Sequence, residues 1–158
     1  MFLNAFFFSL FIAGLVVTFT YCFITGISPV SSTWTSRKAI LKLTSKKLET
    51  LKRQKLLYEK AVTDQVSRGR FTLDQEFHAS HIQISGNLYL TDYFREVYQR
   101  IFLRHRIEGL RADRARAVVS EHNEIFEAIS LKDAERAGES IRFHIEAGKQ
   151  YIFSVIFG

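Results

Sequence analysis

The sequence predicts an all-α protein, an antiparallel helical bundle preceded by one hydrophobic N-terminal helix. Apolar side chains recur at helical spacing in successive segments from residue 44 onward, and no segment alternates in period two long enough to make a strand. One proline and eight glycines among 158 residues argue against a loop-rich fold. Short connections between such helices favour antiparallel neighbours.

The chain divides into three regions by composition. Residues 1–27 form a hydrophobic segment without a charged side chain, long enough for a transmembrane helix, with a non-native leader as the alternative. Basic residues follow from Arg37 on, which predicts a cytoplasmic sensor domain, anchored to the inner membrane if residues 2–27 span it. We expect residues 28–43 to be a polar linker and residues 44–158 to be one helical domain.

Five helices are predicted in that domain. The first begins at Thr44 or Ser45, and the next covers residues 71–85, before the helix-breaking pair Gly86 and Asn87. The later helices are expected over residues 88–108 and 113–129 and from Ser130, which we assign as the cap of the last helix.

A metal site is predicted from four residues on three of these helices. Asp74 and His78 are four residues apart and therefore lie on one helix face. His122 and His144 lie on the apolar faces of the last two helices, and helical bundles build metal sites from such facing side chains. One carboxylate and three imidazoles suit Zn, Ni, Mn or Fe. Three core histidines with ordinary hydrogen bonds are the alternative.

Two stretches, LDQEFHASHIQISGN and EHNEIFEAISLKDAERAGESIRFHIE, resemble the effector-binding C-terminal (FCD) domain of FadR-like GntR-family transcriptional regulators. The resemblance covers about residues 44–155. It implies a helical bundle that forms homodimers, a divalent metal, most often Zn or Ni, and a small carboxylate effector at the open positions of the metal. The positions that match the family pattern are Asp74, Phe77, His78, Ser85, Gly86, Asn87, Glu121, His122, Asp133, Ala137 and His144.

Effector contacts are assigned to four further residues. Arg95 and Arg142 can offer a guanidinium to a second carboxylate. His81 lies on the stripe of Asp74 and His78 and is expected to line the pocket without binding the metal. Asn87 belongs to the Ser-Gly-Asn element of the family pattern.

Nothing in residues 1–43 resembles the winged-helix domain or the first FCD helix of the family. We therefore expect a shortened regulator, with no DNA-binding residues and no specific DNA binding by this chain alone. Its net charge of +6 supports only weak, salt-sensitive association with nucleic acid.

The function predicted is a metal-binding, carboxylate-sensing domain of a GntR/FadR-type regulator, with no catalytic residues. One alternative is a metal-dependent hydrolase, although the sequence holds no HExxH motif. Another is a membrane-tethered dimerisation module, in contact with the membrane through residues 2–27, that titrates intact regulators.

Overall fold

The protein is described by a computed structural model that covers residues 29–66, 69–105 and 111–157. This part of the chain is built from α-helices alone, which confirms the predicted fold class. In chain order the helices are α2 (Pro29–Leu41), α3 (Ser45–Thr63), α4 (Arg70–Ile84), α5 (Leu88–His105), α6 (Ala112–Ser130) and α7 (Ala134–Phe157). The hydrophobic helix predicted within residues 1–27 lies outside the described residues.

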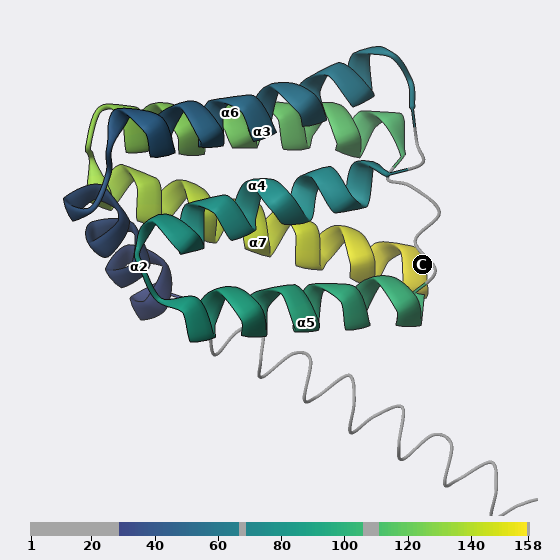
Figure 1. Cartoon of the computed structure of the whole chain (residues 1–158). Helices are drawn as coiled ribbons and strands as arrows, with labels where there is room; N and C mark the ends of the chain where they lie inside the picture. The colour runs from purple at the N-terminus through teal and green to yellow at the C-terminus, as the bar shows by residue number, and fades with distance from the viewer. Residues whose placement is uncertain (1–28, 67–68, 106–110, 158) are drawn as a thin grey trace, which may run out of the picture.

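Helices α3 to α7 form the bundle, and each runs antiparallel to the helix before it (Figure 1). α3 packs against α4 and α6, α6 packs against α7, and α5 packs against α4. α2 lies across one end of these helices, where it contacts α7 and α4 (Figure 1). Among the described helices, none combines the length and the apolar character that crossing a bilayer requires.

The prediction of a linker over residues 28–43 is wrong for residues 29–41, which form α2. Ser36 and Ala39 are fully buried on this helix, and Arg37 pairs with Glu135 at the start of α7. The serines and threonines of the segment suggested a linker, but small polar side chains also allow a close approach between helices. Tertiary packing has here overridden a weak local preference.

Capping side chains define the starts of α3 and α7. Thr44 caps α3, since its hydroxyl accepts a hydrogen bond from the backbone N–H of Lys47 at 3.3 Å, as predicted. For α7 the prediction of Ser130 was wrong: Asp133 accepts from the N–H of Arg136 at 3.0 Å. Ser130 instead ends α6, where its hydroxyl donates to the carbonyl of Glu127.

The hydrophobic core fills the space between α3, α4, α6 and α7, with Ala39 added from α2. Its buried members are Ala39, Leu51, Phe77, Ile84, Ile125, Ala128, Ile129, Ala137 and Ile141. The apolar positions of each helix recur every three or four residues, so burying one stripe fixes the rotation of the helix. The polar residues that share these stripes are consequently turned inward as well.

Candidate metal centre

Asp74, His78, His122 and His144 meet inside the bundle. Each offers one ligand atom, and these four atoms all lie within 4.8 Å of one another. Nε2 of His78 is 2.9 Å from Nε2 of His144, and Oδ1 of Asp74 is 3.1 Å from Nε2 of His122. Atoms bound about 2.1 Å from a shared ion would lie about 3 to 4.2 Å from each other. The separations of 2.9 and 3.1 Å lie near the short end of this range, and the limit of 4.8 Å for the whole set is slightly above its long end, so a bound ion would draw the ligands a little closer together.

Packing holds the imidazole of His122 in place. Its ring stacks on that of Phe77, with centroids 4.1 Å apart, and lies 5.0 Å from the ring of Tyr58 on α3. Only 1% of His122 is exposed to solvent. The apolar stripe of α4 thus supplies Phe77 as a support for the imidazole while it aims Asp74 and His78 at the same point.

Several buried polar atoms of the cluster have no hydrogen-bond partner among the described residues. They are Oδ1 of Asp74 and both ring nitrogens of His122. The contact of 3.1 Å between Asp74 and His122 does not give either atom a well-formed hydrogen bond. A buried polar atom without a partner is costly, and a divalent cation would satisfy Oδ1 and Nε2 together. The residues therefore fit a divalent metal ion.

The protonation states also suit a cation. Burial alone would raise the pKa of Asp74, but its contact with His122 and the nearby His78 and His144 lower that pKa to about 2. Burial lowers the pKa of His78 well below its usual range, and the neighbouring His144 lowers it further. Burial lowers the pKa of His122 as well. At neutral pH the cluster thus holds the carboxylate of Asp74 and the neutral imidazoles of His78 and His122, which have lone pairs available for a metal.

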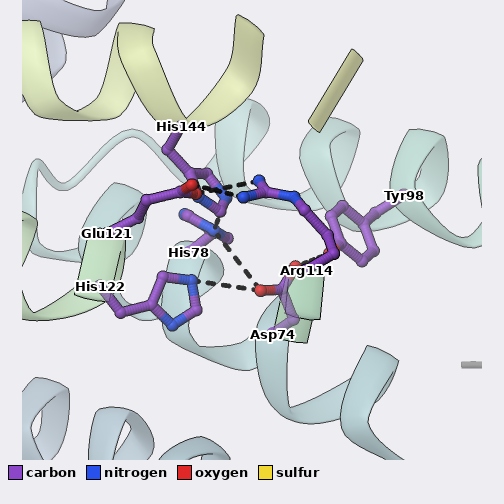
Figure 2. A network of polar contacts seen from close by, with 7 residues as sticks. All are labelled: Asp74, His78, Tyr98, Arg114, Glu121, His122 and His144. Atoms are coloured by element: carbon purple, nitrogen blue, oxygen red, sulfur yellow. Dashed lines mark hydrogen bonds and ion pairs between the residues drawn. The ribbon is translucent and has the colours of Figure 1, made fainter. Parts of the chain in front are cut away.

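Three further side chains surround the cluster: Tyr98, Arg114 and Glu121 (Figure 2). The hydroxyl of Tyr98 on α5 donates to Oδ2 of Asp74. Oε2 of Glu121 is 2.6 Å from Nδ1 of His144, and Arg114 contacts both oxygens of Glu121. Sequence reasoning gave no site role to Tyr98 or Arg114. Arg114 could have been found from its spacing: it lies seven residues, or two helical turns, before Glu121 and therefore on the same face of the helix.

A comparison with protein families identifies the family to which the chain belongs. The FCD domain family matches residues 33–147. The chain belongs to the FCD domain family. The match begins inside α2, so this FCD domain includes residues 33–43 of the segment that was predicted to be a linker. Among curated proteins, no significant match was found.

Solved structures of GntR-type regulators share the fold of this FCD domain. McbR/YncC of E. coli superposes with a TM-score of 0.71 at 14% identity, over 84% of this chain and 63% of that one. GntR of Streptococcus agalactiae gives a TM-score of 0.68 at 20% identity, over 80% of this chain and 56% of that one. The FCD domain thus spans about three fifths of the length of these two regulators.

The predicted effector residues of the FCD domain are not gathered at the cluster. Asn87 caps α5, because its side-chain oxygen accepts from the N–H of Leu90 at 3.0 Å. Arg95 pairs with Glu76 at 3.0 Å, and Arg142 is exposed on α7. His81 is buried, and its Nε2 has no hydrogen-bond partner among the described residues. Of the four, His81 alone retains a buried polar atom with which to meet a ligand.

Proposed function

We propose that this FCD domain is the sensor part of a GntR/FadR-type transcriptional regulator, and that it binds a small carboxylate through a divalent metal. Asp74, His78, His122 and His144 would hold the ion, with zinc or nickel as the best match to one carboxylate and three imidazoles. Regulators of this class bind small-molecule effectors and usually form dimers, so we assign the working protein to a homodimer in the cytoplasm.

The observation that carries the proposal is the convergence of Oδ1 of Asp74 and Nε2 of His122 without a hydrogen bond in a buried cluster. A core stabilised only by hydrogen bonds would leave these atoms unsatisfied at a cost of about 1–3 kcal/mol each. A bound divalent ion supplies positive charge that anchors a carboxylate at coordination positions the protein leaves open. The four side chains would hold that ion in the buried interior of the bundle.

A hydrolytic function is disfavoured by the surroundings of Glu121. Hydrolytic metal sites commonly pair the metal-bound water with a nearby carboxylate or imidazole that is free to take a proton. Glu121 is the carboxylate next to the cluster in Figure 2, and its oxygens are already engaged by Arg114 and His144. Among the described residues drawn there, no free base remains, which favours ligand sensing over catalysis.

Elemental analysis tests the metal. We expect the purified protein to carry about one equivalent of zinc or nickel, or to take it up on titration, and His122→Ala and His144→Ala to lose it. His81→Leu is the matched control, because it removes a buried imidazole of the same helix bundle that is not one of the ligands. A wild-type protein that neither contains nor binds metal would refute the proposal.

The carboxylate is tested by calorimetry with citrate as the probe. Citrate should bind the metal-loaded protein and fail to bind the chelator-treated protein, because the metal provides its anchor. Equal binding with and without metal would show that the anion site lies elsewhere.

A further inference from the structure

A buried ion pair lies directly behind one of the predicted metal ligands. Arg114 and Glu121 are only 10% and 9% exposed, and they lie two turns apart on α6. Nη2 of Arg114 is 2.9 Å from Oε2 of Glu121, and Nη1 contacts Oε1, so the contact between the guanidinium and the carboxylate is bidentate. In Figure 2 the carboxylate of Glu121 lies next to the side chains of Arg114 and His144, with which it makes these contacts.

This arrangement determines which nitrogen of His144 carries the proton. A neutral imidazole has one N–H donor and one lone pair, and a carboxylate can only accept. Because Oε2 of Glu121 lies 2.6 Å from Nδ1, the hydrogen must sit on Nδ1. Nε2 is left with its lone pair, and Nε2 is the atom that lies 2.9 Å from His78 inside the cluster.

Arg114 allows Glu121 to remain a charged hydrogen-bond acceptor in a buried position. Burying an unpaired carboxylate away from water carries a large desolvation cost, and such a group takes up a proton because its neutral form avoids that cost. The two-armed contact with Arg114 neutralises the charge and fixes the plane of the carboxylate. Glu121 is thereby kept as an acceptor with one lone pair directed at His144. His122, by contrast, has no hydrogen bond to Nδ1 among the described residues.

We propose that Arg114 and Glu121 are a positioning pair that holds His144 with Nε2 toward the metal and thereby sets the metal affinity of the site. The inference rests on the proposed function, since it assigns a role to residues behind the same cluster. Outer partners of this kind typically change metal affinity by about 10- to 100-fold when they are removed.

The test is a competition titration of zinc against a chromophoric chelator. Glu121→Gln should weaken zinc binding by about 10- to 100-fold with unchanged stoichiometry. The matched control is Glu124→Gln, which removes an exposed carboxylate one turn further along α6 and should bind zinc like the wild type. If Glu121→Gln does not fold because Arg114 is left unpaired, the double variant Arg114→Met with Glu121→Gln removes both charges and serves instead.

A double-mutant cycle separates positioning from a general effect of charge. His144→Ala is expected to lose its metal during purification, so the cycle is measured at zinc concentrations high enough to fill the weakened three-ligand site. In that background Glu121→Gln should cause no further loss of zinc affinity, because the side chain on which it acts is gone. An equal loss in both backgrounds would show that Glu121 acts through its charge alone and would overturn the proposal. So would a Glu121→Gln variant that binds zinc within twofold of the wild type.

The tautomer of His144 gives a readout that does not depend on metal. Nitrogen chemical shifts of the metal-free protein should show the proton on Nδ1 of His144 in the wild type and a mixture in Glu121→Gln. If the wild type shows this tautomer but binds no metal, the positioning stands and the proposed function fails. If it binds metal while His144 carries its proton on Nε2 in the metal-free state, the positioning fails and the proposed function stands.

Discussion

Tyr98 donates a hydrogen bond to Oδ2 of Asp74, while the other oxygen of the same carboxylate faces Nε2 of His122 at 3.1 Å. The two oxygens thus have separate partners, and the bond from Tyr98 fixes the rotation of the carboxylate about its last torsion. Because Tyr98 belongs to α5, this bond also connects the cluster to a helix that contributes none of the four predicted ligands.

Replacing Tyr98 by Phe should weaken metal binding about tenfold while the fold is retained. The change leaves the ring in contact with its neighbours and deletes only the hydroxyl that orients Asp74. A competition titration with zinc measures the effect. Tyr89→Phe, on the same helix and 91% exposed, is the control and should match the wild type. Equal affinities for the wild type and Tyr98→Phe would contradict an orienting role.

Bound metal should raise the melting temperature of the protein, and a carboxylate should raise it further only while the metal is bound. An ion that binds only the folded state adds about 2.7 kcal/mol to the free energy of unfolding at a hundredfold excess over its Kd. A chelator should therefore lower the melting temperature, and citrate should raise it only while metal is present. His144→Ala should show neither response, whereas His81→Leu, which removes no predicted metal ligand, should keep the response to metal. A citrate effect that survives chelation would count against a metal-anchored anion.

The metal-free protein should lose stability as the pH falls from about 6.5 to about 4. Burial lowers the pKa of His81 from 6.5 to about 4 in the folded protein. Between these values the unfolded chain binds a proton that the folded protein does not, so acid favours unfolding. The titration of His81 should lower the free energy of unfolding by up to about 3 kcal/mol at pH 4, and it should have no effect above pH 6.5. His78 and His122, whose pKa values are also lowered by burial, act in the same direction.

Urea unfolding at a series of pH values, in the presence of a chelator, measures this dependence. His81→Gln should flatten the curve because it retains a polar side chain but removes the titration, and His81→Leu should flatten it equally. A wild-type curve that is level between pH 7 and pH 5 would show that His81 titrates normally in the folded state.

Asn87→Ala should lower the free energy of unfolding by about 1 kcal/mol, because it removes the cap of α5. Asn87→Asp keeps an acceptor at the same place and should restore most of that loss. Zinc affinity and the citrate response should be unchanged in both variants. Loss of the citrate response in Asn87→Ala without loss of stability would instead support the effector role that was predicted from the sequence.

The fold could be predicted because its main signals are local. Helical spacing of apolar residues and the break at Gly86 set α3 to α7 close to their observed bounds. At Gly86 the backbone adopts a φ of 78°, a conformation that residues with a Cβ rarely adopt, so glycine is favoured there. The same local reasoning failed for α2, whose helical state depends on contacts with α7 that the segment itself does not encode.

The four predicted ligands could be found from spacing, and the structure brings them together. Their outer partners could not be found in this way. Arg114 and Tyr98 reach the cluster only because α5 and α6 have particular rotations and offsets relative to α4. Conversely, Arg142 is two residues from His144, which places it on another side of α7 and in solvent. Nearness in sequence to a ligand is therefore a poor guide to nearness in the site.

The packing of α2 on α7 has a consequence for the synthesis of the protein. Arg37 and Glu135, which pair across this contact, are 98 positions apart in the chain. Contacts at such a separation form late, because a long loop must be closed before they are made. A nascent chain emerging from the ribosome holds α2 without its partner and at most three of the four ligands until His144 has been added. The proposed metal centre and the closure of the bundle would thus be completed together, by the last described helix.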